Sequence, residues 1–100
     1  MPNSKPTDWI FAQPKNEMTV TTSSIMYGGK PILMVSRVVD GGTWMFLDGG
    51  PFSMDDAMLV TLQTIVAHDS SVCELAEMSL GWSARRESTD RSWEISCDED

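Results

Sequence analysis

The pattern of hydrophobic and polar positions is clearest at residues 32–39, which read ILMVSRVV and are nearly apolar on both faces. Such a run predicts a central strand that is covered on two sides. The earlier segment 18–22, MTVTT, is rich in β-branched side chains and predicts another strand. Residues 23–27 either continue that strand or form a short helical turn, and the glycines and proline of residues 28–31 then make a turn.

Two Asp-Gly-Gly triplets, at residues 40–42 and 48–50, flank an alternating run that contains Trp44 and Phe46. Asp-Gly between two apolar runs predicts a β-hairpin, because the turn needs positive φ angles that glycine adopts without steric cost. A phosphate-binding loop would need a Gly-Lys-Ser/Thr ending or spaced glycines before a helix, and a calcium loop would need alternating oxygen ligands that end in a glutamate. Neither pattern is present, so we interpret the glycines as turn residues and both aromatic side chains as core.

Residues 53–68 carry mixed signals. Ser53, with Asp56 three residues further on, predicts a helix start, but residues 59–62 are β-branched enough to form a short strand instead. Residues 64–68 predict about one turn of helix.

A better helix signal follows, because Ser71 and Glu74 have capping-box spacing. Three apolar residues repeat there at the spacing of one helix face: Val72, Leu75 and Ala76. The sequence therefore predicts a short helix that packs on the core and ends at Gly81.

Residues 82–87 alternate as a strand does. The side chains expected on one face are Trp82, Ala84 and Arg86. After a turn, residues 91–95 return as the second arm of a hairpin. The remaining segment, SCDED at residues 96–100, is too polar and acidic to fold and is expected to be a disordered tail.

Together these elements predict an α+β fold: an antiparallel sheet of hairpins, with about five strands, and one or two short helices from the middle of the chain. The 100 residues suffice for a single domain. We expect residues 1–8, with two prolines, to form a loose arm, and residues 9–95 to form the folded core. Trp9 and Phe11 are expected to dock on that core before the first strand.

The distribution of charge is more informative than the net charge of −8. No lysine or arginine occurs from residue 38 to residue 84, whereas seven acids fall in that span: Asp40, Asp48, Asp55, Asp56, Asp69, Glu74 and Glu77. A negative field repels nucleic-acid phosphates and anionic membranes and attracts basic groups. We therefore expect these acids to form one coherent anionic face that a basic partner protein recognises, and no binding to nucleic acid or membrane.

Two cysteines, Cys73 and Cys97, are too few for a disulfide framework and are interpreted as free thiols in a reducing compartment. The first residues lack the apolar region of a signal peptide, and no apolar run approaches the roughly 18–20 residues of a membrane span. The expected location is the cytoplasm.

Side-chain sets for catalysis or metal binding are scarce in this sequence. His68 is the one histidine, and Cys73, five residues on, does not share its helix face, so no nucleophile–base pair is predicted. A structural zinc site needs four soft ligands, which one histidine and two distant cysteines do not supply. The acid pairs Asp55–Asp56 and Glu74/Glu77 are interpreted as solvated or helix-terminal charges. We predict no enzyme activity, no cofactor and no metal.

Arg85 and Arg86, with Trp82 and Trp93 nearby in the sequence, are suited to an anion-binding or cation–π surface. The interpretation that we favour for this patch is that the arginines pair with the acidic middle of the same chain. The residues predicted to contact a partner are Asp48, Asp55, Asp56, Glu74, Glu77, Trp82, Arg85 and Arg86.

The order of aromatic and turn residues resembles that of a group of short, uncharacterised bacterial proteins. The shared features are an Asp-Gly turn followed by Trp-x-Phe-Leu at residues 40–47, Gly-Trp-x-Ala-x-Arg-x-Ser at residues 81–88, and the closing Trp93. The chain is also similar to immunity proteins of bacterial polymorphic toxin systems, although residues 69–71 lack the proline of their Asp-Pro-Ser helix start. The resemblance implies a fold and a bacterial origin, and it supplies no catalytic residue.

Three functional hypotheses follow from the sequence. The first is a non-enzymatic, acidic protein-binding module, and in particular an immunity-type inhibitor of a basic partner. The second is a small-ligand-binding or enzymatic domain that uses Arg85, Arg86 and nearby carboxylates. The third is an obligate homodimer of structural role, joined through an exposed apolar strand; the first hypothesis is compatible with a monomer or a homodimer.

Overall fold

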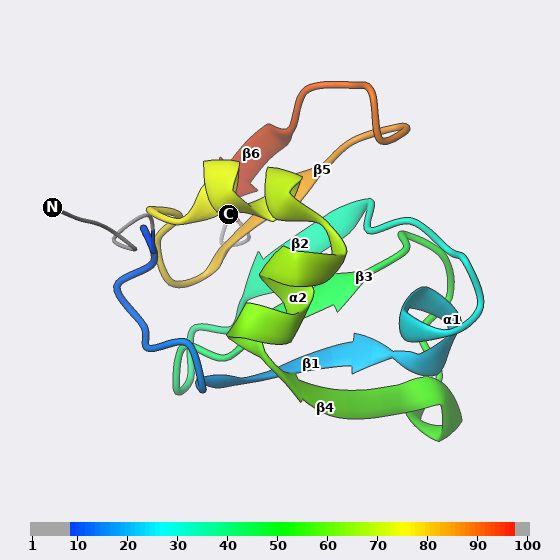
Figure 1. The fold of residues 1–100 in the computed structure, drawn as a ribbon. Helices are drawn as coiled ribbons and strands as arrows, with labels where there is room; N and C mark the ends of the chain where they lie inside the picture. The colour runs from blue at the N-terminus through cyan, green and yellow to red at the C-terminus, as the bar shows by residue number, and fades with distance from the viewer. Residues whose placement is uncertain (1–8, 98–100) are drawn as a thin grey trace, which may run out of the picture.

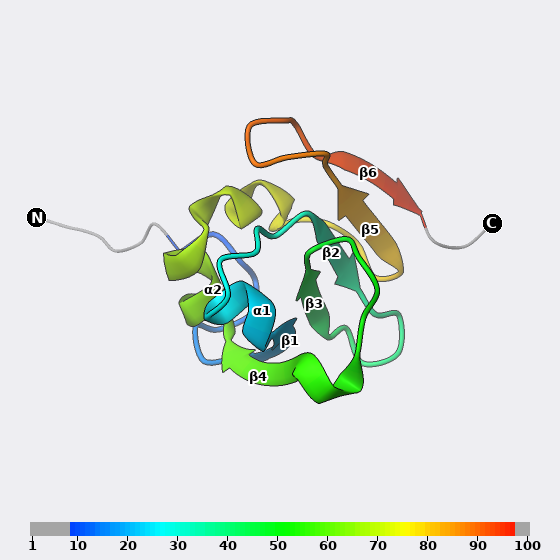
Figure 2. The same cartoon turned by 90° about the vertical axis from the view of Figure 1, so that its right-hand side faces the viewer.

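The computed structural model describes residues 9–97, and within them the chain forms one six-stranded sheet with its helices gathered on one face (Figures 1 and 2). The elements in chain order are β1 (Met18–Thr22), α1 (Ser23–Met26), β2 (Met34–Arg37), β3 (Trp44–Leu47), the 3-10 helix η2 (Met54–Asp56), β4 (Ala57–Thr61), α2 (Leu62–His68), the 3-10 helix η3 (Ser70–Leu75), β5 (Trp82–Arg85) and β6 (Glu94–Cys97). The predicted α+β class is confirmed. The predicted loose arm, residues 1–8, and the last part of the predicted tail, residues 98–100, lie outside the described residues.

The sheet has the strand order β4-β1-β3-β2-β5-β6 and is mixed, so the prediction of a purely antiparallel sheet of about five strands is wrong. β3 lies between β1 and β2 and runs parallel to β1, with Val20 opposite Met45. The reason is that β2 and β3 pair as a hairpin, and β1 pairs with the edge of β3 that is turned away from β2. Turn residues fix only the pairing of adjacent strands, so this long-range choice leaves no local signal.

The additional strand is β4, in the segment whose sequence signals were mixed. It pairs antiparallel with β1 along five residues, from Met18 opposite Thr61 to Thr22 opposite Ala57. The backbone N–H of Leu62 donates to the carbonyl of Glu17 at 2.8 Å and continues this pairing into the first turn of α2. The β-branched composition of residues 59–62 therefore correctly indicated a strand, which ends one residue earlier.

Both hairpins that the sequence predicted are present. β2 pairs antiparallel with β3, and Gly41 and Gly42 occupy the connecting turn with φ angles of 91° and 73°, as the turn interpretation requires. β5 pairs antiparallel with β6 in a regular register, from Trp82 opposite Cys97 to Arg85 opposite Glu94. β6 extends through Ser96 and Cys97, so the assignment of these two residues to an acidic tail is wrong, because backbone pairing does not require apolar side chains.

The short helices begin at polar caps. The Thr61 hydroxyl accepts from the backbone N–H of Thr64 at the start of α2, and the Ser53 hydroxyl caps η2 as predicted. η3 is capped by Asp69 rather than by Ser71, and it is a 3-10 helix. The Asp69 carboxylate accepts from both the N–H and the hydroxyl of Ser71, so η3 starts at Ser70, earlier than predicted.

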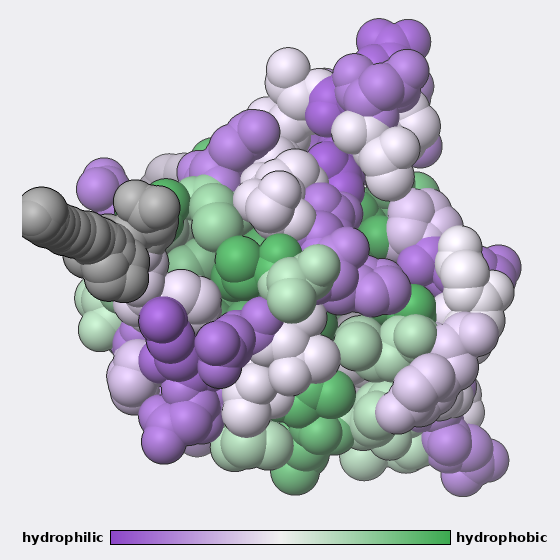
Figure 3. Space-filling model, viewed as in Figure 1, coloured by the Kyte–Doolittle hydropathy of each residue, from purple (hydrophilic) through white to green (hydrophobic). Residues whose placement is uncertain are grey.

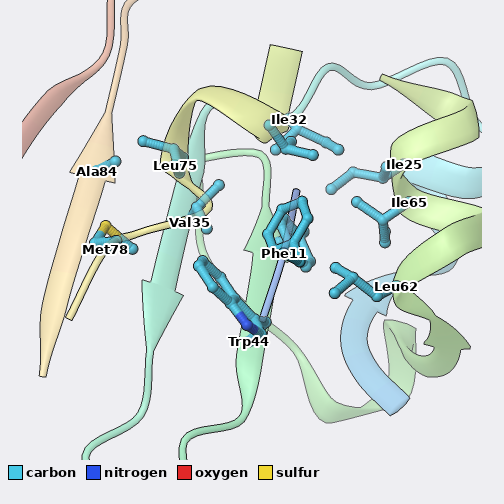
Figure 4. Packing of buried hydrophobic residues seen from close by; sticks show 12 residues of the cluster. Phe11, Ile25, Ile32, Val35, Trp44, Leu62, Ile65, Leu75, Met78 and Ala84 are labelled. Carbon is cyan, nitrogen blue, oxygen red and sulfur yellow. The ribbon is translucent and has the colours of Figure 1, made fainter. Parts of the chain in front are cut away.

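The core lies between the helices and the covered face of the sheet (Figure 4). Trp44 and Phe46 are fully buried, as predicted, and their rings stack with centroids 6.0 Å apart. Phe11 packs edge-on against Trp44 and Trp9 packs against Phe11, which confirms the predicted aromatic anchor. Val35 is the one fully buried residue of β2, so the prediction that this central strand is covered on two sides is wrong, and helices cover one face only.

Candidate functional site

Arg86, a predicted partner-binding residue, is buried and used inside the domain. Its guanidinium donates to the carbonyl of Ile32 at 2.9 and 3.1 Å, to the Ser71 hydroxyl at 3.0 Å and to the Asp69 carboxylate at 2.9 Å. The ring of Trp93 lies 4.1 Å from its charged carbon. Arg86 therefore joins the end of β5 to η3 and to the segment before β2, and the interpretation that the arginines pair with acids of the same chain holds for this residue.

The negative charge of Asp69, the partner of Arg86, is compensated by this ion pair. Burial raises the pKa of its carboxyl, but the hydrogen bonds from Ser71 and the nearby Arg86 outweigh this, so the pKa lies below its ordinary value. Asp69 is thus one acid of the cation-free span, residues 38–84, whose charge is already paired inside the domain.

Arg85 points to solvent in an open cleft of about 690 Å³ between the β5–β6 hairpin and the ends of β2 and β3. In Figures 1 and 2 this hairpin projects from the body of the domain. The cleft also contains Arg91, the buried Arg86 and four acids: Asp48, Glu87, Asp90 and Glu94. Acids therefore outnumber arginines, and one of the three arginines is already bonded, which disfavours an anionic ligand here.

Asp55 and Asp56 lie in η2, just before the edge strand β4, whereas Asp48 follows β3 and lines the cleft of Arg85. The Asp48 carboxylate accepts from the N–H of Gly50 at 2.9 Å, and Asp55 is exposed in η2. Asp56 accepts from the hydroxyls of Ser23 and Ser24 in α1, and these bonds lower the pKa of its carboxyl below the ordinary value. Two of these three acids thus hold local structure.

Three other predicted residues, Glu74, Glu77 and Trp82, are brought together. They line a groove of about 290 Å³ between η3 with its following turn and strands β5 and β6. Its remaining lining residues are Leu75, Met78, Ser79 and Ile95. We call this site the acidic groove, because an apolar floor is bordered by two carboxylates and an indole ring.

Alternation along the strands explains how the acidic groove is built. Ala84 is buried in the core, so Trp82, two residues away, is on the same helix-bearing face. Ile95 lies opposite Ala84 in the adjacent strand and shares that face. η3 ends before it reaches these residues, so Trp82 stays 37% exposed and Ile95 48% exposed.

The two groove glutamates are exposed and keep their charge available. Within residues 9–97 the one ion pair is that between Asp69 and Arg86, so neither Glu74 nor Glu77 is paired with a described cation. Sequence reasoning missed Leu75, Met78 and Ile95 as groove residues. Ile95 could have been found, since it alternates with the polar residues of the second hairpin arm.

The cation-free span does not form one continuous anionic face. Glu74 and Glu77 line the acidic groove beside β5 and β6, whereas Asp55 and Asp56 precede β4 at the opposite edge of the sheet. Asp40 lies exposed in the β2–β3 turn, and Asp69 is paired. The expectation of a single coherent face is therefore wrong, because folding distributes neighbouring acids around the sheet.

The remaining candidates for chemistry stay apart. His68 ends α2 and is exposed, as expected for a surface histidine, while Cys73 is half-buried and burial raises the pKa of its thiol. No group of three or more metal-binding side chains occurs in the part of the chain that the structure describes. Over the same residues, no helix has the length and apolar character that crossing a bilayer requires.

Comparison with protein families, with curated proteins and with solved structures gives no match. The resemblance to uncharacterised bacterial proteins and to immunity proteins therefore stays a prediction from the sequence.

Proposed function

We propose that this protein is a non-enzymatic, acidic binding module that docks on a basic region of a partner protein through the acidic groove. The observation that carries the proposal is the convergence of Glu74, Glu77 and Trp82 around an apolar floor. These residues come from separate elements, and none of them is among the residues that hold the core together.

The chemistry of the groove supports a cationic side chain as its occupant. An arginine combines an apolar stem with a planar charge, so its stem can cover the exposed Ile95 while its guanidinium meets the two carboxylates. The exposed Trp82 ring adds a cation–π surface. An anionic ligand would face the same two uncompensated negative charges, which is unfavourable.

An immunity-type inhibitor is the particular form of this proposal that the sequence resemblance implies. Such a protein has to recognise one partner surface and need not carry out a reaction, and the net charge of −8 favours rapid capture of a basic partner. The alternative of a ligand-binding or enzymatic domain at Arg85 and Arg86 is less well supported, because Arg86 is bonded inside the protein.

The proposal is tested by titrating the isotopically labelled protein with a short blocked peptide of glycine and arginine and recording amide and indole NMR shifts. We expect the shifts to concentrate at Glu74, Glu77 and the Trp82 indole, and binding to weaken as salt rises, because the carboxylates are exposed. Shifts spread over all the acids, or binding that is indifferent to salt, would contradict the proposal.

A matched pair of double variants separates local recognition from net charge. Glu74→Gln with Glu77→Gln removes two charges from the acidic groove, and Asp40→Asn with Asp55→Asn removes two charges elsewhere. We expect the first to weaken peptide binding at least about fivefold and the second to change it less than about twofold. Equal losses in both double variants would show that the groove has no special role.

A further inference from the structure

We infer that the partner presents an extended, arginine- or lysine-bearing segment, which pairs antiparallel with the outer edge of β6 and places its cationic side chains in the acidic groove. This inference rests on the proposed function, and it adds the conformation of the partner and the way it attaches to the sheet.

β6 is a terminal strand of the described sheet, with β5 as its neighbour on one side (Figures 1 and 2). All four of its residues, from Glu94 to Cys97, are exposed. Its pairing with β5 is regular and free of bulges, so the strand keeps the geometry that a further strand needs. An open edge of this kind is the usual acceptor for strand addition.

The direction of the backbone groups along β6 follows from bonds further inside the sheet. The N–H of Val38 donates to the carbonyl of Thr43 at 2.9 Å. By alternation, Ser36 and Met34 of β2 also direct their backbone groups toward β3. Val35 and Arg37, the residues between them, direct their backbone groups toward β5, in agreement with the bond from the N–H of Gly81 to the carbonyl of Arg37 at 2.7 Å.

The same alternation continues across β5 into β6. Val35 and Ala84 lie opposite each other and direct their backbone N–H and C=O groups toward each other. Ser83 and Arg85, which alternate with Ala84, therefore direct their backbone groups toward β6. Their partners in β6, Ser96 and Glu94, direct their backbone groups back toward β5. Ile95 and Cys97 therefore direct their backbone N–H and C=O groups away from the sheet, toward an incoming strand.

Ile95 connects this edge to the acidic groove. It directs its backbone outward and its side chain into the groove beside Trp82. In an antiparallel pair, the residue opposite Ile95 shares its face and lies about 5 Å from it. A cationic side chain at that position therefore starts next to Ile95 and is long enough to reach Glu74 or Glu77.

The charge of the site argues for a basic partner rather than a second copy of this chain. Two copies joined antiparallel along β6 would place their helix-bearing faces on the same side. Each copy would then present Glu74 and Glu77 toward the equivalent glutamates of the other, with no lysine or arginine in β6 to offset them. Like charges facing each other at an interface weaken association.

The test uses a blocked peptide of about seven residues that alternates threonine and arginine, and isothermal titration with the chain of residues 1–100. One peptide is N-methylated at the arginine amides and a second at the threonine amides. In antiparallel pairing with the arginines on the groove face, the arginine amides point to β6 and the threonine amides point away. We expect methylation of the arginine amides to lower affinity at least about tenfold and methylation of the threonine amides to change it less than about twofold.

Equal effects of the two methylation patterns would overturn strand addition. If the peptides still lost affinity with Glu74→Gln and Glu77→Gln, the proposed basic-partner site would survive that result. If the unmethylated peptide bound the Gln double variant as well as the wild type, the proposed function itself would fail. A peptide with glutamate in place of arginine provides the charge control, and its binding as tightly as the arginine peptide would overturn both.

Discussion

Arg86 shows how a residue that looks like a ligand contact can serve the structure. Its side chain is almost completely buried, and every direction of the guanidinium is used by the carbonyl of Ile32, the Ser71 hydroxyl, the Asp69 carboxylate or the Trp93 ring. Arg85, its neighbour, points to solvent instead. Two adjacent arginines therefore have different roles because a strand directs successive side chains to opposite faces.

Replacing Arg86 by methionine is expected to lower the free energy of unfolding by about 3 kcal/mol, because the Ile32 carbonyl and the Asp69 carboxylate lose their partner. Chemical denaturation measures the change. Arg85→Met is the matched control and is expected to stay within about 0.5 kcal/mol of the wild type. Similar effects of the two substitutions would refute the structural role of Arg86.

At the scale of elements, the sequence predicted hairpins better than it predicted the sheet. The two Asp-Gly-Gly triplets and the alternation around Trp44 located β2, β3 and their turn, because the relevant interactions are local. The parallel pairing of β1 with β3 and the position of β4 at the edge depend on contacts between distant residues, such as Val20 with Met45. For the same reason the sequence could propose Glu74, Glu77 and Trp82 as site residues but could not show that they meet.

The β2–β3 turn provides a prediction at this scale. Gly41→Ala is expected to cost about 1 kcal/mol, because alanine is strained at its φ of 91° although there is space for the methyl group. Gly42→Ala is expected to cost about 2 kcal/mol. There the added carbon also lies 3.1 Å from Arg37 and from Leu80, and Arg37 is held by the carbonyl of Met78 and the ring of Trp44.

Thermal or chemical unfolding of both alanine variants gives the comparison. If Gly41→Ala were as destabilising as Gly42→Ala, contact with Arg37 and Leu80 would not be the cause.

At the scale of the whole molecule, the acids are divided among separate sites, and the two edges of the described sheet differ. The β6 edge adjoins the acidic groove, whereas β4 carries the exposed Leu59, and neighbouring β1 carries the exposed Met18. The β6 edge fits a basic segment, and the β4 edge is the exposed apolar strand on which the homodimer hypothesis depends.

We expect the protein to remain a monomer in sedimentation experiments at two concentrations that differ about tenfold, because the net charge of −8 opposes self-association. A mass that doubles with concentration would contradict this expectation. If Leu59→Lys then restored the monomer, the β4 edge would be the dimer interface and the homodimer hypothesis would gain support.

The sequence by itself determined the α+β class, the two hairpins, the aromatic core residues and the excess of negative charge, since each of these depends on composition or on neighbouring residues. The tertiary structure alone decided the strand order, the internal pairing of Arg86 with Asp69 and the meeting of η3 with β5 and β6. The physical reason is that burial and pairing between distant segments are settled collectively as the chain packs. Glu74 and Trp82 thus border one groove, while Asp55 and Glu74, both within the cation-free span, lie at opposite edges of the sheet.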